Sequence, residues 1–263
     1  MMNYILPLLI FAVLGLSAGI LLTVISKAFA VKTDERLEAV QNALPQVNCG
    51  ACGYSGCNDY ADAIVNHGAV INKCNPGGEE TAHKISKIMG KEAGDIQSVT
   101  AFVHCRGDCD AAPHKYEFGG ISSCVAANRF YSGSKQCTNG CLGFGDCLSV
   151  CSQGAIKISN GVAFIDNRLC EGCGLCVKAC PKGLISLRRK NQRTDVVCQS
   201  EVPAKITKKL CKNGCVGCKL CEKACPTGAM SVKNNCAKID YDKCANCGAC
   251  ANACKMGVIK LSD

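Results

Sequence analysis

The sequence lacks tryptophan altogether, and aromatic residues make up only 5% of its 263 residues. This scarcity leaves little bulk for a large hydrophobic core, so we expect small modules held together by cross-links or metals. No G-x-G-x-x-G follows an expected strand and no P-loop occurs, so nucleotide binding by this chain alone is unsupported. No Ser/His/Asp or Cys/His nucleophile arrangement stands apart from the cysteine motifs either.

Charged residues are absent from positions 1–26, a stretch longer than the roughly 20 apolar residues needed to cross a bilayer. Lys27, Lys32 and Arg36 follow this stretch and no basic residue precedes it, which favours an uncleaved anchor over a signal peptide. We therefore expect a single transmembrane helix within 1–30, in the cell (inner) membrane and in contact with lipid. The cysteine-rich remainder would lie on the cytoplasmic side.

Cysteine, by contrast, is abundant, with 26 residues. Pairing them all as disulfides would demand an oxidising compartment. Most fall in C-x2-C or C-x3-C runs, which place several thiolates around one small object and suit metal ligation better. The formal charge of +9 counts every cysteine as neutral, and [4Fe-4S] cores with four thiolates would largely cancel it. The basic balance therefore does not indicate a nucleic-acid partner.

The first cysteine group lies in NCGACGYSGC and has its fourth member in KCNPGG. Its spacing, C-x2-C-x4-C-x16-C, predicts one cubane [4Fe-4S] cluster, with glycines that let the backbone wrap closely. A structural zinc site is the alternative, which this spacing and glycine density disfavour. The predicted ligands of cluster 1 are Cys49, Cys52, Cys57 and Cys74.

Three later runs, CEGCGLCVKACP, CVGCKLCEKACP and CANCGACANACK, share the spacing C-x2-C-x2-C-x3-C. In this two-cluster ferredoxin pattern the first three cysteines hold one cubane and the fourth reaches the neighbouring one. The register that aligns Cys170 with Cys244 also aligns Cys147 with Cys221, so the chain contains a tandem duplication. The predicted ligands are Cys151, Cys170, Cys173 and Cys176 for cluster 3, Cys215, Cys218, Cys221 and Cys254 for cluster 4, and Cys225, Cys244, Cys247 and Cys250 for cluster 5.

The run CTNGCLGFGDCLSVC departs from this pattern. Phe144 stands where the second copy has Cys218, and Cys137 lies one short loop upstream, so we expect Cys137 to replace the missing ligand. Its counterpart in the second copy, Cys211, is left without a required role. The predicted ligands of cluster 2 are Cys137, Cys141, Cys147 and Cys180.

Six cysteines lie outside these five sets. Cys236 aligns with Val162 and is most simply a small buried hydrophobe. The segment HCRGDC, together with Cys124 and a fourth thiolate from Cys198 or Cys211, would complete a sixth cluster; spare thiols or a zinc site are the alternatives. His104 is a candidate substitute ligand. The set considered for cluster 6 is Cys105, Cys109, Cys124 and Cys198.

These motifs predict an α+β chain with an N-terminal transmembrane helix, a small helical 4Fe-4S domain and two tandem bacterial 2[4Fe-4S] ferredoxin-like modules. Nine Lys and Arg residues between Lys182 and Lys212 form either a solvated face or a docking surface for an acidic partner, with Arg188, Arg189 and Lys190 as candidates. The expected segments are an anchor (1–30), an amphipathic linker (31–44), the 4Fe-4S domain (45–90), a connecting cysteine-containing segment (91–136), module 1 (137–190), a basic inter-module segment (191–210) and module 2 (211–263).

The apolar N-terminus, the NCGACGYSGC and KCNPGG motifs, CRGDC, CTNGCLGFGDC and the ferredoxin runs together resemble the B subunit of the Rnf complex, in its long, cluster-rich form. The resemblance implies an electron-relay subunit of a membrane-bound, ion-translocating ferredoxin:NAD+ oxidoreductase, with no catalytic site of its own. Its partners would be soluble ferredoxin as electron donor and the membrane, flavin-bearing and NADH-binding subunits, and the complex would transport Na+ or H+. An anchored Fe-S subunit of another membrane hydrogenase or dehydrogenase is the alternative.

Overall fold

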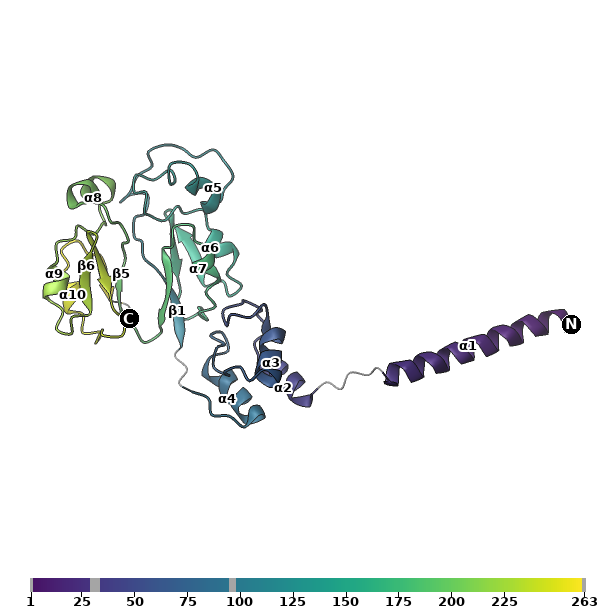
Figure 1. Ribbon diagram of the computed structural model, residues 1–263. Coiled ribbons are helices and arrows are strands. Elements are labelled where there is room, and N and C mark those ends of the chain that lie inside the picture. Colours follow the sequence, from purple (N-terminus) through teal and green to yellow (C-terminus); the bar gives the residue numbers. More distant parts are fainter. Residues whose placement is uncertain (1, 29–33, 95–97, 262–263) are drawn as a thin grey trace.

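The computed structural model describes residues 2–28, 34–94 and 98–261; within the first range, side chains are described for 11–26. The chain forms a row of small parts that begins with an isolated helix, continues through a three-helix domain and ends in two ferredoxin-like modules (Figure 1). The modules lie beside each other at the far end of the row, and the helical domain lies next to the first of them. This order follows the duplication expected from the cysteine motifs.

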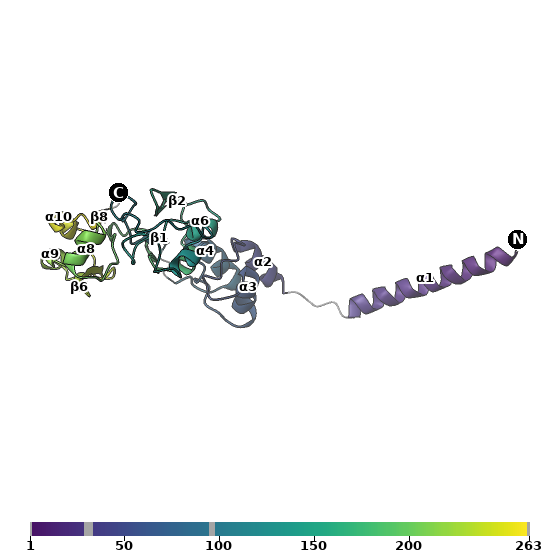
Figure 2. The same ribbon diagram turned by 90° about the horizontal axis from the view of Figure 1, so that it is seen from above.

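Helix α1 (Met2–Ala28) lies apart from the other elements in both ribbon views (Figures 1 and 2). Its described side chains are all exposed. In the part of the chain that the structure describes, no helix combines the length and the apolar composition needed to span a membrane. The expected anchor over 1–30 also includes residues 1, 29 and 30, which lie outside the described residues, as do 31–33 of the expected linker.

The small helical domain packs α2 (Glu35–Ala43), α3 (Cys57–Asn66) and α4 (Gly78–Met89) around one apolar core. Tyr60 and Ile64 are four residues apart on α3, so both face this core, as an amphipathic helix requires. The Tyr60 hydroxyl donates a hydrogen bond to the carbonyl of Val70, 2.7 Å away. This contact fixes the loop that leads to Cys74.

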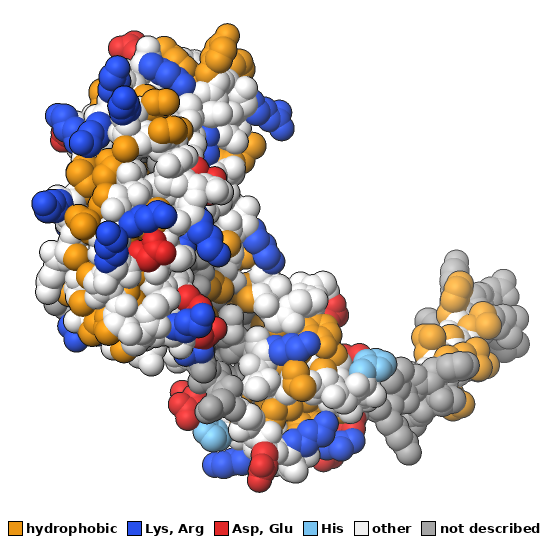
Figure 3. All heavy atoms as spheres, turned by 60° about the vertical axis from the view of Figure 1, so that its left-hand side comes forward, with side chains coloured by type: hydrophobic (Ala, Val, Ile, Leu, Met, Phe, Trp, Pro, Cys, Tyr) orange, Lys and Arg blue, Asp and Glu red, His pale blue; other side chains and the backbone are white. Residues whose placement is uncertain are grey.

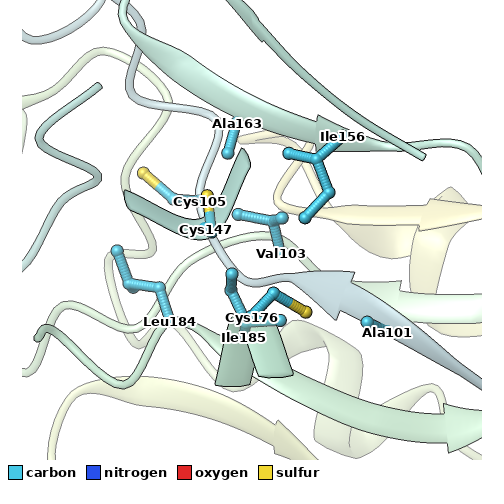
Figure 4. Close-up of a cluster of buried hydrophobic side chains, with 9 residues drawn as sticks. All are labelled: Ala101, Val103, Cys105, Cys147, Ile156, Ala163, Cys176, Leu184 and Ile185. Carbon is cyan, nitrogen blue, oxygen red and sulfur yellow. The ribbon is translucent and has the colours of Figure 1, made fainter. Parts of the chain in front are cut away.

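The first module contains a hairpin, β2 (Ile156–Ser159) and β3 (Val162–Ile165), and the short helices α6 (Asp146–Ser149) and α7 (Leu175–Ala179). A second antiparallel pair joins β1 (Val99–Val103) to β4 (Ile185–Arg189). Side chains from both pairs, with three cysteines, form the core shown in Figure 4. Because β1 comes from the expected connecting segment 91–136, the boundary expected at residue 137 leaves out one strand of the module.

The second module repeats this plan with β6 (Met230–Lys233), β7 (Cys236–Ile239), α9 (Leu220–Lys223) and α10 (Ala249–Ala253). Its outer pair joins β5 (Thr194–Val196) to β8 (Ile259–Leu261). The two hairpins pair in the same register, since Ile156 faces Ile165 in the first copy and Met230 faces Ile239 in the second. The duplication also includes the outer strand β5, which lies in the expected inter-module segment 191–210.

Two short helices lie outside the repeated plan. Helix α5 (Cys124–Asn128) belongs to a long loop of the first module, and α8 (Ala204–Leu210) precedes the ligand loop of the second. Cys124 is the first residue of α5, and Cys211 caps the end of α8. Both helices therefore place thiols near the modules.

A buried ion pair joins the two modules. The guanidinium Nε of Arg188 on β4 lies 3.1 Å from a carboxylate oxygen of Asp195 on β5, and the two side chains are 1% and 0% exposed. The Tyr241 hydroxyl also donates to Asp195, at 3.0 Å. The sequence placed Arg188 on either a solvated face or a docking surface, but the structure buries it against Asp195. The next residue, Arg189, pairs with Asp242 at 2.7 Å.

Candidate metal centres

All 26 cysteines are free thiols, without a disulfide among them. Among the described residues, no three His, Cys, Asp or Glu side chains converge closely enough to hold a single metal ion. Four groups of four thiols instead line separate, mostly apolar cavities in or between the modules. Each thiolate of a cubane cluster binds a different iron, so a cubane needs a wider arrangement of this kind.

The four cysteines expected for cluster 1 lie together in the helical domain. The pKa of Cys74 is raised to about 11, chiefly by burial and in part by the neighbouring thiolates of Cys57, Cys49 and Cys52. The amide of Cys57 donates to the side-chain oxygen of Asn48, 2.8 Å away, which fixes the start of α3 against the loop. The four thiols of the helical domain therefore lie near one another.

The set expected for cluster 3 lines a cavity under β1 and β2. Its four thiols, Cys151, Cys170, Cys173 and Cys176, share this cavity with Ala101 and Ile156. The amide of Ala101 donates to Sγ of Cys170, 3.3 Å away. Burial raises the pKa of Cys176 to about 11, and the other three thiolates add to this effect. Amide donors aimed at sulfur suit the thiolates of an iron-sulfur cluster.

In the second module, the set expected for cluster 4 lines one cavity, consisting of Cys215, Cys218, Cys221 and Cys254. The amide of Val258 donates to Sγ of Cys254 at 3.3 Å, and the amide of Ala237 donates to Sγ of Cys215 at 3.4 Å. Because Val258 belongs to the stretch that enters β8 and Ala237 to β7, the strands of the module orient this site.

The set expected for cluster 5 lies at the other end of the same module. Burial raises the pKa of Cys250, and the thiolates of Cys225 and Cys244 raise it further, so these three lie together. The fourth, Cys247, is exposed on the loop before α10. This site thus approaches the molecular surface.

The set expected for cluster 2 differs from the arrangement in the structure. The cavity beside Cys141, Cys147 and Cys180 is completed by Cys124 and not by Cys137. Burial raises the pKa of Cys147 to about 12, with added effects from the thiolates of Cys141, Cys124 and Cys180. The carboxylate of Asp146 accepts the amide of Cys124 at 2.7 Å, which fixes the start of α5 beside α6.

An insertion in the first module explains this substitution. The segment 106–136, between Cys105 and Cys137, is much longer than the segment 199–210, between the structurally equivalent Cys198 and Cys211. The additional length includes α5 with Cys124. The register that aligns Cys170 with Cys244 also aligns Cys124 with Cys198, because a fixed register takes no account of an insertion. The unequal loop lengths were the signal that could have revealed Cys124.

Cys137 lines a different cavity, between the two modules, together with Cys105, Cys198 and Cys211. The pKa of Cys211 is raised to about 11, chiefly by burial and in part by the thiolates of Cys137, Cys105 and Cys198. The set considered for cluster 6 therefore changes. Cys105 and Cys198 remain in it, Cys124 belongs to the cavity of Cys147, and Cys109 lies elsewhere.

Two cysteines belong to none of these groups. Sγ of Cys109 lies 3.4 Å from Nε2 of His114. Cys236 is fully buried, and its thiol donates to the carbonyl of Cys198 at 3.3 Å. The candidate ligand His104 has both ring nitrogens engaged, Nδ1 at 2.8 Å from the carbonyl of Val196 and Nε2 at 2.7 Å from the hydroxyl of Ser186.

Comparisons with known proteins find iron-sulfur family models over parts of this chain. A family model described as "Putative Fe-S cluster" matches residues 44–76, and one described as "4Fe-4S dicluster domain" matches 169–229 and 214–258. Both cover ligand groups described above. They support [4Fe-4S] chemistry, which the donor sets of four cysteines with amide hydrogen bonds to sulfur also fit.

Three curated relatives match almost the whole chain. The B subunit of a Na(+)-translocating ferredoxin:NAD(+) oxidoreductase complex from Acetobacterium woodii is 44% identical over 93% of this chain and 74% of the relative. The B subunit of a proton-translocating complex from Clostridium ljungdahlii is 40% identical over 94% and 87%. The B subunit of an ion-translocating oxidoreductase complex from Methanosarcina acetivorans is 37% identical over 89% of both. The resemblance drawn from the cysteine motifs is thereby confirmed, and the chain belongs to the B-subunit family of Rnf-type ion-translocating oxidoreductase complexes.

Proposed function

We propose that the chain is the electron-transfer subunit of a membrane-bound ferredoxin:NAD+ oxidoreductase that transports Na+ or H+. It would receive electrons from reduced ferredoxin and pass them towards the membrane, flavin-bearing and NADH-binding subunits of the complex. When bound, [4Fe-4S] clusters supply one-electron transfer, while the protein supplies spacing, burial and hydrogen bonds to sulfur. The observation that carries this proposal is the continuous row of cysteine groups.

The first half of the row runs from the helical domain into the first module. The thiolate of Cys49 is close enough to Cys173 to add to the effect of burial, which raises the pKa of Cys173. Within the module, burial raises the pKa of Cys147, and Cys176 of the neighbouring group adds to this effect. The group of the helical domain therefore adjoins the group of Cys151, which adjoins the group of Cys124.

The second half of the row crosses between the modules. The amide of Cys141 donates a hydrogen bond to Sγ of Cys105, and the amide of Cys215 donates one to Sγ of Cys198, each with a length of 3.3 Å. In the second module, Cys221 and Cys250 belong to one buried core. Every group thus has a neighbour on the path from the helical domain to the end of the second module.

The second module is also the place where we expect ferredoxin to dock. Cys218 and Cys247 are its exposed ligand cysteines, and exposed lysines, Lys219 and Lys243, stand close to them in sequence. Figure 3, which brings this side of the molecule forward, shows many Lys and Arg side chains and few acidic ones. Such a surface complements an acidic partner and steers its approach.

Attachment to the membrane would come from the N-terminus. Residues 1–26 carry no charge, and Lys27, Lys32 and Arg36 follow them. We therefore propose that 1–30 form a single-pass anchor in contact with lipid, and that the cysteine-rich part lies on the cytoplasmic side. Fusion of residues 1–33 to a soluble reporter would test this, since extraction from membranes by high salt or alkali would contradict an anchor.

The test of the proposed function is an anaerobic reduction experiment on the full chain. Purified protein should be brown, with about 20 to 24 iron atoms and as many sulfide atoms for five or six cubanes. Mixing with reduced low-potential ferredoxin should bleach its visible absorbance and give the EPR signals of reduced [4Fe-4S] clusters. Zinc in place of iron and sulfide, or full iron with no reduction by ferredoxin, would contradict the proposal.

A further inference from the structure

We propose that Cys105, Cys137, Cys198 and Cys211 hold a [4Fe-4S] cluster at the junction of the two modules, in a site to which each module contributes the same two positions. The role of this site in electron transfer rests on the proposed function, whereas its existence does not.

The two modules contribute equivalent cysteines. Cys105 lies two residues after the end of β1, and Cys198 lies two residues after the end of β5. Strands β1 and β5 occupy the same place, since β1 pairs with β4 and β5 pairs with the equivalent strand β8. Cys137 and Cys211 are aligned with each other by the register of the duplication. The four thiols are therefore two matched pairs that face each other across the junction.

Matching hydrogen bonds reach one sulfur in each module, that of Cys105 in the first and that of Cys198 in the second. Sγ of Cys105 accepts the amides of Cys141 at 3.3 Å and Gly107 at 3.4 Å. Sγ of Cys198 accepts the amides of Cys215 at 3.3 Å and Ser200 at 3.5 Å. Neutral thiols do not need two amide donors each, but the thiolates of an iron-sulfur cluster are typically stabilised in this way.

Hydrogen bonds join the loops that carry Cys105 and Cys211. The amide of Lys212 donates to the carbonyl of Ala111, and the side-chain amide of Asn213 donates to the carbonyl of Arg106, each at 2.8 Å. These bonds tie the loop of Cys211 to the loop of Cys105. Gly107 allows the close approach, since a Cβ atom there would lie 3.2 Å from Sγ of Cys211. Three of the four cysteines, Cys105, Cys137 and Cys211, are buried.

A buried cation compensates the charge that four thiolates would bring. Lys135 is 1% exposed, and its ammonium donates to the carbonyls of Gly107 at 2.8 Å and Gly161 at 2.7 Å. Gly107, whose carbonyl accepts one of these hydrogen bonds, donates its own amide to Sγ of Cys105, so the ammonium lies next to the loop that holds Cys105. A buried cation is costly without negative partners, so its presence favours an anionic site beside it.

The experiment counts iron in single and double variants of the full chain, purified anaerobically. C105S and C211S should each lose about four iron and four sulfide atoms, and C105S/C211S should lose no more than either one, because both thiols serve one site. C109S is the matched control, since it removes a cysteine four residues from Cys105 that points to His114, and it should keep its full complement. C198A and C137A should repeat the loss from two other loops.

Three results would overturn the site. They are full iron in C211S, an additive loss of about eight iron atoms in C105S/C211S, and zinc in the wild-type chain at this position. Limited proteolysis should show the same fragments for C211S and wild type, and if C211S collapses, C198A and C137A provide the same test. The outcome is separable from that of the proposed function, because a wild-type chain reduced by ferredoxin while C211S keeps all its iron would reject this site alone.

Discussion

The main-chain amide of Cys215 donates a hydrogen bond to Sγ of Cys198, 3.3 Å away. The thiol of Cys215 thus belongs to the set expected for cluster 4, whereas its amide bonds to a sulfur of the neighbouring set at the junction of the modules. The equivalent residue of the first module, Cys141, does the same with Cys105. Neighbouring metal centres would therefore be joined by very short stretches of protein, which favours transfer between them.

Double variants can test whether Cys124, and not Cys137, shares a cluster with Cys147. C124S/C147S should lose about four iron atoms, because both cysteines line one cavity, whereas C137S/C147S should lose about eight. Iron and sulfide analysis of anaerobically purified protein would measure the difference. If C137S/C147S loses only about four, the set Cys137, Cys141, Cys147 and Cys180 expected from the sequence holds after all.

Replacing Lys135 with methionine should lower the reduction potential of nearby clusters. A buried cation favours the reduced, more negative state, and Lys135 influences Cys105, Cys137 and Cys141. EPR-monitored redox titration should show this shift, with exposed Lys208 changed to methionine as control. K135M should also lower thermal stability, since each of two carbonyls loses a donor at about 1–3 kcal/mol. An unchanged potential would contradict this role.

Replacing Arg188 with glutamine should reduce the stability of the protein much more than replacing Arg189 with glutamine. R188Q leaves the Asp195 carboxylate buried without its ion-pair partner, at a cost of about 3–5 kcal/mol. The Arg189 pair with Asp242 is exposed, so R189Q should cost about 0–1 kcal/mol. Thermal loss of visible absorbance would report the difference. Equal melting temperatures for the two variants would show that the inter-module ion pair contributes little.

Cys236 should influence potentials without holding iron. The Cys236 side chain is the largest cause of the lowered pKa, about 6, of both Cys198 and Cys215, although its single thiol proton can be donated to only one acceptor at a time. C236A should keep about 24 iron atoms and lower the potentials of the adjoining clusters, because hydrogen bonds to sulfur favour the reduced state. C236S keeps a donor and should restore most of the shift. Loss of about four iron atoms from C236A would instead identify Cys236 as a ligand.

Charge reversal near the exposed cysteines should weaken the reaction with ferredoxin. K219E/K243E should slow the second-order reduction rate about tenfold or more at low salt, with a smaller effect at high salt. The matched control is K205E/K208E on α8, which changes charge equally but lies away from Cys218 and Cys247 in sequence. Stopped-flow absorbance would measure the rates. A larger effect in the control would move the docking surface to α8.

The spacing of the cysteines alone predicted which thiols of a single loop lie together. In C-x2-C-x2-C-x3-C the chain between thiols is too short to place them far apart, so local geometry decides that Cys170, Cys173 and Cys176 gather. The tandem repeat of the cysteine runs likewise predicted two ferredoxin-like modules, and the structure gives both a hairpin in the same register. The family followed from the same motifs, because their order along the chain is distinctive.

Tertiary structure decided which distant thiols meet and which charges are buried. Cys124 and Cys137 both precede Cys147 in one long loop region, and spacing cannot tell which of them returns to Cys147, because an insertion changes the path of the loop. Only the strand pairing shows that Cys105 is the counterpart of Cys198, and only packing buries Arg188 against Asp195. Local sequence determines contacts over a few residues, whereas contacts across loops and modules depend on how strands pair and side chains pack.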